Sequence, residues 1–248
     1  MQLKEARVLV VDDELALLEI FKRWFEREGC RVFTAQDGAQ ALDLASANAV
    51  DMVVSDIRMP VLDGIELAKR LKKRSGHAPK MIFISGFSDV SEREGFDLGV
   101  EAMLHKPIER ADLVAAARRS LMDRDELWRQ PPAVAPTAVL DARFPSLSAA
   151  RQQGLIAFGR GGFCLRSNRF LQVGKPVGLR LEFEADRHAL IGQGVVRWME
   201  RRDEQIGIEI AYVDDAQRAW FAQLAESDES ASFIPRTSIP ATGPSSAA

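Results

Sequence analysis

Short apolar runs alternate with longer amphipathic segments over the first half of the chain. Segments 15–25, 41–45 and 65–71 repeat apolar residues every three or four positions, which predicts amphipathic helices. Alternation of such helices with short apolar runs is typical of βα units that build a parallel sheet. The expected strands are Val8–Val11, Val32–Ala35, Met52–Ser55, Met81–Ile84 and Ala102–Leu104.

The pattern changes after residue 121. The segment 124–128 prolongs the last helix with charged residues, and the proline-rich stretch 131–136 then forms an extended connector, where we expect a domain boundary. Beyond it, short strands separated by turn residues predict a small antiparallel β-barrel, followed by one closing helix from Asp215 to Leu224. The expected strands are Ala138–Ala142, Leu155–Phe158, Phe163–Arg166, Val177–Glu184, Ala189–Trp198 and Gln205–Val213.

The chain is therefore expected to hold two domains. Residues 1–124 form an α/β domain, 125–137 a helical and Pro-rich linker, and 138–226 a β-barrel domain. Residues 227–248 are rich in Ser, Ala, Pro and acidic residues and too poor in apolar residues to build a core, so we expect a disordered tail.

Composition excludes several classes of protein. The 248 residues carry 33 Lys and Arg against 36 Asp and Glu, so we expect no nucleic-acid partner. The sequence shows neither a signal segment nor a membrane-spanning stretch, which predicts a cytoplasmic protein without membrane insertion. Cys30 and Cys164 lack metal-ligand spacing and are expected to be buried. Three isolated histidines are expected to be solvated loop residues, namely His77, His105 and His188.

One aspartate stands at the end of an apolar strand. The stretch "MVVSDIRMP" runs from Met52 into Asp56 and is stopped by Pro60. A strand that is apolar throughout is covered on both faces, so its terminal carboxylate must lie where the sheet opens to water. In an open α/β sheet, that edge binds ligands.

Other polar side chains follow the neighbouring strands at the same edge. Asp12 and Asp13 follow the first strand, Ser85 the fourth and Lys106 the fifth, so with Asp56 they are expected to converge. Taken singly, an aspartate could cap the next helix, the serine could be a turn residue and the lysine a solvated amine. Together, the oxygen ligands are suited to a hard cation such as Mg²⁺.

The motifs "VLVVDDE", "DIRMPVLDG", "ISGFSD" and "LHKPI" resemble those of the receiver domain of two-component response regulators. The resemblance covers about residues 5–122. It implies a flavodoxin-like, doubly wound five-stranded parallel sheet in the order 2-1-3-4-5. It also implies a Mg²⁺-dependent phosphoryl acceptor without a stand-alone enzymatic activity.

The resemblance assigns a role to each polar residue at the sheet edge. It makes Asp56 the phosphoryl acceptor and places Lys106 and Ser85 against the phosphoryl group. The implied Mg²⁺ ligands are Asp12, Asp13, Asp56 and the backbone carbonyl of Arg58. Receivers commonly carry Tyr or Phe three residues before the lysine as a switch ring, whereas this chain has Met103, and Phe87 is an alternative.

The second half is similar to a PilZ domain in its turns and strands. The stretches "LIAFGRGGFCLRS", "LQVGKPVGLRLEF" and "IGQGVVRWME" occur in the order that such a domain has. The aspartate and serine that the family uses to bind cyclic di-GMP are replaced by Ala157 and Gly159, and no arginine pair with the required spacing precedes the barrel. The resemblance therefore implies a degenerate PilZ-like domain, for which we do not expect cyclic di-GMP as a ligand.

These features predict a phosphorylation-controlled response regulator of a two-component phosphorelay. Asp56 receives its phosphoryl group from a sensor histidine kinase or a phosphotransfer protein, and the PilZ-like domain signals to an unidentified downstream protein by direct contact. Two alternatives stay open. The chain could be a cyclic di-GMP receptor with an atypical PilZ site, or a phosphate-sink receiver that needs no output.

Overall fold

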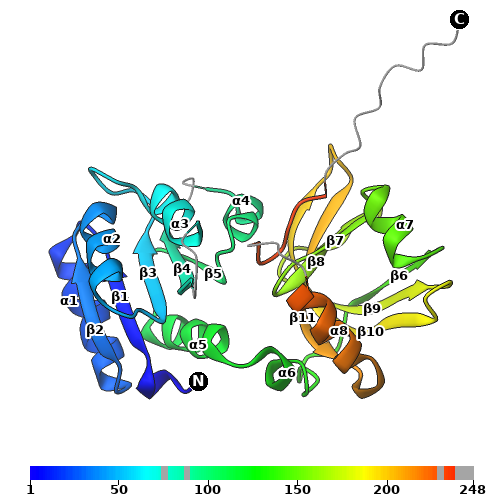
Figure 1. Ribbon diagram of the computed structural model, residues 1–248, viewed down its shortest axis with the longest axis horizontal. Coiled ribbons are helices and arrows are strands. Elements are labelled where there is room, and N and C mark those ends of the chain that lie inside the picture. The colour runs from blue at the N-terminus through cyan, green and yellow to red at the C-terminus, as the bar shows by residue number, and fades with distance from the viewer. Residues whose placement is uncertain (74–77, 87–89, 228–231, 238–248) are drawn as a thin grey trace, which may run out of the picture. The chain divides into compact units, whose positions relative to one another are not determined.

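The computed structural model describes residues 1–73, 78–86, 90–227 and 232–237, without the side chains of 225–227. Two units are distinguished along the chain (Figure 1). The N-terminal unit comprises Met1–Asp123 with Ala231–Phe233, and the C-terminal unit comprises Arg124–Ser230 with Ile234–Ala248.

The N-terminal unit is built on a five-stranded parallel sheet in the order β2-β1-β3-β4-β5, which confirms the predicted order. Its strands are β1 (Arg7–Val11), β2 (Arg31–Ala35), β3 (Met52–Asp56), β4 (Lys80–Ser85) and β5 (Ala102–His105). Its helices are a 3-10 turn η1 (Leu3–Glu5), α1 (Leu15–Arg27), α2 (Gly38–Ala47), α3 (Gly64–Lys72), α4 (Glu92–Asp97) and α5 (Arg110–Leu121).

Alternate strand residues enter two separate cores, one on each face of this sheet. Val8 and Val10 of β1 pack with α1 and α5, whereas Leu9 and Val11 pack with α2 and α3. Successive side chains of a strand point to opposite faces, so a strand that is covered on both faces must be apolar at every position. This explains why β3 is buried from its first residue to Asp56.

Side-chain caps fix where three of the helices begin. Asp37 accepts hydrogen bonds from two backbone N–H groups of α2, and Asp63 accepts one from Glu66 in α3. Ser91 and Glu94 form a reciprocal capping box at the start of α4. Each cap satisfies donors that the first turn of a helix leaves unpaired.

The short helix α4 packs closely against β5. A Cβ atom at Gly95 would lie 2.3 Å from the sulfur of Met103, which is 9% exposed. Met103, at the expected switch position, therefore packs its thioether against Gly95. The alternative, Phe87, lies outside the described residues, as does His77.

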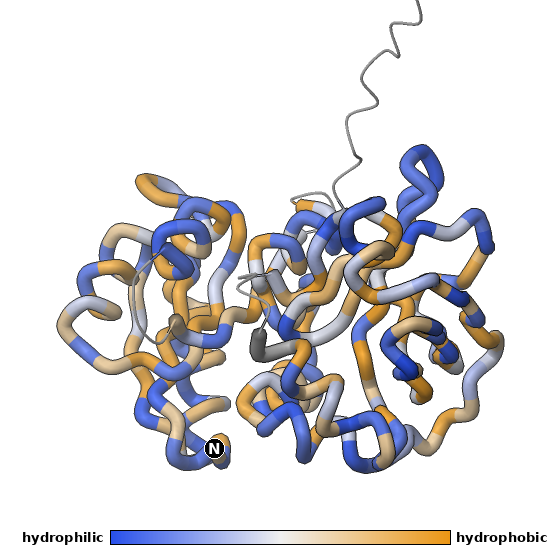
Figure 2. The backbone as a smooth tube through the Cα atoms, turned by 45° about the vertical axis from the view of Figure 1, so that its right-hand side comes forward, coloured by the Kyte–Doolittle hydropathy of each residue, from blue (hydrophilic) through white to orange (hydrophobic). Residues whose placement is uncertain are grey.

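The C-terminal unit is built on a six-stranded sheet in the order β6-β9-β10-β11-β8-β7. Its strands are β6 (Ala138–Phe144), β7 (Ile156–Phe158), β8 (Gly162–Arg166), β9 (Pro176–Phe183), β10 (His188–Glu200) and β11 (Gln205–Val213). Its helices are α6 (Arg124–Leu127), α7 (Leu147–Gln152) and α8 (Asp215–Ser227). In Figure 2, hydrophobic colour runs through many strands, while several loops are hydrophilic.

This sheet corrects the prediction of an antiparallel barrel. β6 pairs with β9 in parallel, so the curled sheet is mixed, and a PilZ-like barrel is not confirmed. The parallel pair arises because α7, β7 and β8 lie between β6 and β9 in the sequence and return the chain to the same end of the sheet. Helix α7 is capped by Ser146, whose hydroxyl accepts the N–H of Ala149, and it was not expected from the strand pattern.

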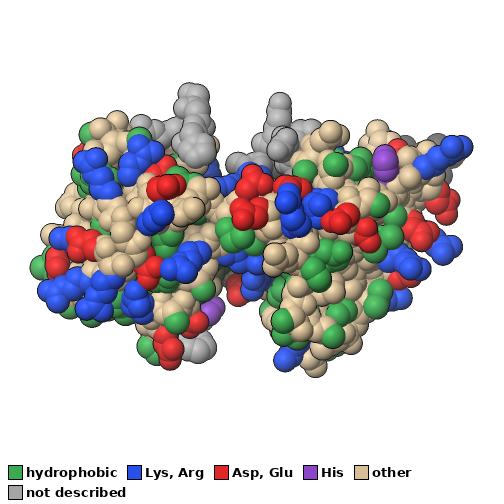
Figure 3. Space-filling view, turned by 90° about the horizontal axis from the view of Figure 1, so that it is seen from below, with side chains coloured by type: hydrophobic (Ala, Val, Ile, Leu, Met, Phe, Trp, Pro, Cys, Tyr) green, Lys and Arg blue, Asp and Glu red, His purple; other side chains and the backbone are tan. Residues whose placement is uncertain are grey.

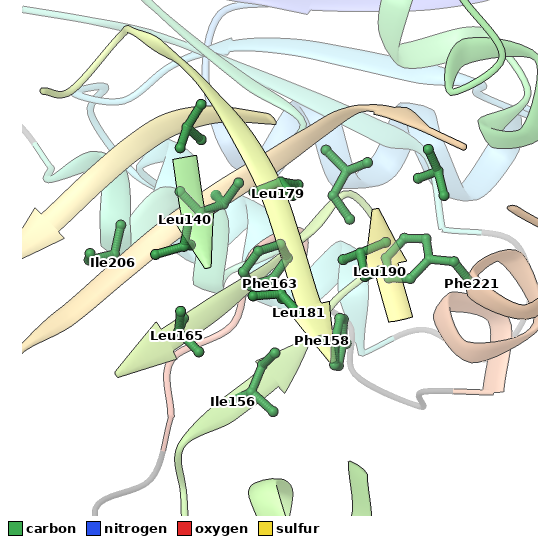
Figure 4. Close-up of a cluster of buried hydrophobic side chains, with 14 of the residues drawn as sticks. Leu140, Ile156, Phe158, Phe163, Leu165, Leu179, Leu181, Leu190, Ile206 and Phe221 are labelled. Carbon is green, nitrogen blue, oxygen red and sulfur yellow. The ribbon is translucent and has the colours of Figure 1, made fainter. Parts of the chain in front are cut away.

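Side chains from the strands and from α8 converge in one core, which Figure 4 shows in close-up. The ring of Phe158 contacts those of Phe163 and of Phe221 in α8, at 5.7 and 5.6 Å between centroids. Trp128, from the segment expected to be a linker, is fully buried and packs on the ring of Phe221 at 5.0 Å between centroids. Residues 124–128 thus contribute to the C-terminal core.

Two backbones approach closely where β8 lies beside β11. A Cβ atom at Gly162 would lie 1.9 Å from the carbonyl oxygen of Ile208, which no side chain can tolerate. A Cβ atom at Gly207 would likewise lie 2.1 Å from the ring of Trp198 in β10. Glycine is required at both positions because a side chain there would displace the neighbouring strand or ring.

Part of the expected tail is described and packs on structured elements. In the N-terminal unit, the N–H of Phe233 donates to the carbonyl of Phe96 at 2.8 Å. In the C-terminal unit, Gln205 Nε2 donates to the carbonyl of Thr237 at 3.2 Å. The remaining tail residues, 228–231 and 238–248, lie outside the described residues.

Both cysteines are buried, as the sequence predicts. The thiol of Cys30 donates to the carbonyl of Leu3 at 3.1 Å, and burial, together with nearby Glu28, raises its pKa to about 11. No helix in the part of the chain described here is long and apolar enough to cross a membrane.

Candidate functional site

Three charged side chains meet at the carboxyl edge of the N-terminal sheet. Lys106, which follows β5, places its Nζ 2.9 Å from Oδ1 of Asp56 and 3.3 Å from Oδ2 of Asp12. Asp12 and Asp56 are 1% and 6% exposed, so the lysine joins two buried carboxylates. Glu14 lies farther away, at 3.8 Å from Nζ, and was not anticipated from the sequence.

Local hydrogen bonds hold the Asp56 carboxylate and its loop in place. Oδ2 accepts the backbone N–H of Arg58 at 3.0 Å, and the Ser55 hydroxyl donates to the Asp56 carbonyl at 2.7 Å. The chain then turns through Val61, whose φ of 65° is positive, and returns so closely that a Cβ atom at Gly64 would lie 2.3 Å from that same carbonyl. The Asp56 carboxylate is thus fixed by backbone geometry as well as by its ion pair.

Burial and charge act in opposite directions on these groups. Burial raises the pKa of Asp12, although the N–H of Glu14 and the charge of Lys106 partly counteract it. Burial alone would lower the pKa of Lys106, but its bonds to Asp56 and Asp12 outweigh this effect and raise it. The site therefore favours a cationic lysine, and the negative charge of Asp12 is only partly compensated.

Asp12→Asn is expected to raise the free energy of unfolding at pH 7 without divalent metal. Because folding raises the pKa of Asp12, its protonated form stabilises the fold at low pH. This contribution is lost as the pH rises from the ordinary value of 3.8 through the folded value. The neutral amide removes that cost, so Tm should rise by a few degrees, the shift that about 1 kcal/mol gives in a domain of this size.

Thermal unfolding in a metal chelator measures this effect, with Asp13→Asn as the matched control. Asp13 is exposed and belongs to the same loop, so its neutralisation should change Tm little. Equal Tm values for Asp12→Asn and the wild type would show that Lys106 already compensates the buried charge.

The side-chain oxygens at this edge of the sheet are of the type that hard cations such as Mg²⁺ prefer. Asp12 and Asp56 are buried carboxylates, and Asp13 follows Asp12 in sequence. A buried charge that is incompletely compensated favours a bound cation. As arranged here, the described His, Cys, Asp and Glu side chains include no group of three that could hold a metal ion. Lys106 instead links the two buried carboxylates.

Ser85, the remaining predicted member, makes a different contact. Its hydroxyl lies 3.0 Å from Nδ1 of His105, and its side chain is fully buried. His105, expected from the sequence to be an isolated loop residue, instead ends β5 and makes this contact. The signal that could have found it is the strand pairing, because His105 lies directly opposite Ser85 in the β4–β5 register.

Residues 8–118 are a response regulator receiver domain: the family of that description matches these residues. The match agrees with the five-stranded sheet order and gives no support to the PilZ-like interpretation of the C-terminal unit.

Two groups of curated relatives resemble the chain over this domain. Response regulator MprA from Mycobacterium sp. (strain KMS) is 40% identical over 116 residues, which cover 46% of this chain and 50% of MprA. Transcriptional regulatory protein PrrA from Mycobacterium tuberculosis is 40% identical over 119 residues, covering 48% of this chain and 51% of PrrA. The chain spans about half the length of these relatives.

Solved receiver structures resemble about half of the chain. The chemotaxis response regulator CheY4 of Vibrio cholerae is 29% identical, with a TM-score of 0.44, and covers 47% of this chain and 98% of its own. The receiver domain of Francisella response regulator 1452 is 32% identical, also with a TM-score of 0.44, and covers 47% and 96% respectively.

Proposed function

We propose that this chain is a phosphorylation-controlled response regulator whose Asp56 accepts a phosphoryl group from a histidine kinase or a phosphotransfer protein. The observation that carries the proposal is the ion pair between Lys106 Nζ and Asp56 Oδ1, at 2.9 Å, on a buried carboxylate at the end of a parallel strand. Its receiver domain and the relatives that are response regulators support it.

In this proposal, an oxygen of Asp56 attacks the phosphorus atom of the donor in line. The bond from phosphorus to the histidine nitrogen breaks, the nitrogen keeps the electron pair, and an acyl phosphate forms on Asp56. Lys106 offsets the negative charge of the arriving group, and the backbone of Arg58 keeps the carboxylate oriented through Oδ2.

The proposal includes Mg²⁺ held by Asp12, Asp13, Asp56 and the carbonyl of Arg58. When bound, the ion supplies positive charge beside the transferring phosphoryl group. Asp12 has the clearest reason to bind it, since burial has raised its pKa and its charge is only partly compensated by Lys106.

We further propose that the C-terminal unit is the output and acts by contact with another protein. Phe170 is 64% exposed and lines two pockets of about 240 and 290 Å³, and nearby Val139 is 55% exposed. Basic and acidic side chains both occur on the face in Figure 3, and the chain as a whole carries 33 Lys and Arg against 36 Asp and Glu, which favours a protein over a nucleic acid as the partner. A degenerate PilZ-like domain without cyclic di-GMP binding remains our hypothesis for this unit, since Ala157 and Gly159 replace the ligand-binding pair.

Incubation of the full chain with acetyl phosphate, with Mg²⁺ or with a chelator, tests the phosphorylation. We expect one phosphoryl group on the peptide that contains Asp56, base-labile as an acyl phosphate is, and only in the presence of Mg²⁺. Absence of the label, or equal labelling in the chelator, would contradict the proposal.

A further inference from the structure

The end of the N-terminal sheet holds a cross-strand hydrogen bond that the proposed phosphorylation does not use. Ser85 Oγ lies 3.0 Å from His105 Nδ1, and the β4–β5 register pairs these two residues directly. In the same register Phe83 pairs with Met103, so the pleat places all four side chains on one face of the sheet. On this face Phe83 and Met103 pack with α3, and Met103 lies against Gly95 of α4. Ser85 is fully buried and His105 is exposed, so the imidazole covers the hydroxyl from the solvent side.

This contact competes with the role proposed for the serine. A serine hydroxyl has a single hydrogen to donate, and a neutral imidazole has one donor nitrogen and one acceptor nitrogen. When Nδ1 is the acceptor, the hydroxyl donates to His105 and has no hydrogen left for a phosphoryl oxygen. Contact with the phosphoryl group then requires that the Ser85–His105 hydrogen bond break.

Position 103, where receivers commonly carry an aromatic switch ring, holds a methionine in this chain. Met103 is the residue at the expected switch position, and its sulfur already lies on Gly95 of α4. Histidine is the one residue type with a ring in β5, whose sequence is Ala-Met-Leu-His. The imidazole of His105 is therefore the ring in this strand whose hydrogen bond depends on the orientation of the Ser85 hydroxyl.

We propose that His105 is a positioning residue for Ser85: its Nδ1 accepts the hydroxyl hydrogen in the unphosphorylated receiver and releases it when a phosphoryl group arrives on Asp56. This inference rests on the proposed function of Asp56. It predicts that removing the His105 side chain strengthens phosphoryl binding. Removal of a residue that merely stabilises the fold would not strengthen it.

The affinity of the full chain for beryllofluoride with Mg²⁺, a phosphoryl analogue, tests that sign by calorimetric titration. His105→Ala should bind about fivefold more tightly than the wild type, the factor that corresponds to the about 1 kcal/mol net contribution of one hydrogen bond. His105→Asn is the matched control, because the amide oxygen of asparagine can stand where Nδ1 stands, and it should restore wild-type affinity. An equal or weaker affinity for His105→Ala overturns the proposal.

A double variant separates the hydrogen bond from other effects of the substitution. Ser85→Ala should weaken binding of the analogue, and adding His105→Ala to it should cause no further change, because the shared hydrogen bond is already absent. A full fivefold effect of His105→Ala in the Ser85→Ala background would show that His105 acts through another contact.

Nitrogen NMR of the imidazole rings gives a readout that does not depend on affinity. The chain has three histidines, and His188, stacked on Trp220 in the C-terminal unit, is an internal reference. Nδ1 of His105 should give the signal of an acceptor nitrogen with Mg²⁺ alone and should shift when beryllofluoride is added, while His188 stays unchanged. A protonated Nδ1 before addition, or no shift after it, contradicts the proposal.

The outcomes for the two proposals differ. A wild type that neither binds beryllofluoride nor is labelled by acetyl phosphate refutes the proposed function and the His105 inference with it. A wild type that does both, together with an unchanged His105→Ala, refutes the His105 inference alone.

Discussion

Asp56→Asn is expected to abolish labelling by acetyl phosphate completely. The asparagine amide keeps the size of the side chain and can still accept the N–H of Arg58, but it lacks the charged carboxylate that pairs with Lys106 and that we propose as the nucleophile. The variant should therefore fold as the wild type does and carry no phosphoryl group. Intact-protein mass spectrometry measures the label directly.

Asp63→Asn is the matched control for this experiment. Asp63 lies in the loop after the same strand, where its side chain caps α3 by accepting the N–H of Glu66 at 2.7 Å. Asparagine caps a helix about as well as aspartate, so this variant should be labelled at the wild-type rate. Labelling of Asp56→Asn at an equally base-labile linkage would show that another carboxylate is the acceptor.

Gly162→Ala is expected to destabilise the C-terminal unit by about 3 kcal/mol, the upper part of the usual range for overpacking. The new methyl group would lie 1.9 Å from the carbonyl oxygen of Ile208 and 2.9 Å from its carbon. Both atoms belong to the backbone of β11, which is paired with β8, so relief requires the two strands to separate. Urea denaturation followed by fluorescence reports it, since Trp128, Trp198 and Trp220 belong to this unit.

Gly178→Ala provides the comparison at a glycine with room for a methyl group. Its nearest neighbour would be a methyl carbon of Val139 at 3.4 Å, an ordinary contact, so its urea midpoint should stay close to that of the wild type. Labelling of Asp56 should survive in both variants, because that site lies in the other unit. Coincident urea midpoints for the two variants would show that β8 and β11 can separate to admit the methyl group without loss of stability.

The sequence was a good guide to the N-terminal sheet because each of its signals is local. A strand that is covered on both faces is apolar throughout, as Met52 to Val54 show, and the helices between strands carry a clear period. Once the strands are parallel, their carboxyl ends must share one edge, and the contact between Lys106 and Asp56 follows from that geometry.

Features that depend on pairing between distant segments were not predictable in the same way. Nothing in residues 138–144 shows that β6 pairs in parallel with β9. Trp128 stands among charged residues and prolines, and only the core around Phe221 explains its burial. The Ser85–His105 contact likewise depends on the β4–β5 register, which the composition of neither strand reveals.

The position of β6 at the edge of the C-terminal sheet has a consequence for self-association. An uncovered edge strand offers free backbone groups to a strand of another copy, which is a common route to aggregation. Here Asp141 and Arg143 are exposed along β6, and the guanidinium of Arg169 donates to the carbonyl of Val139 at 2.8 Å. Charge and an occupied acceptor thus discourage edge-to-edge polymerisation of identical chains.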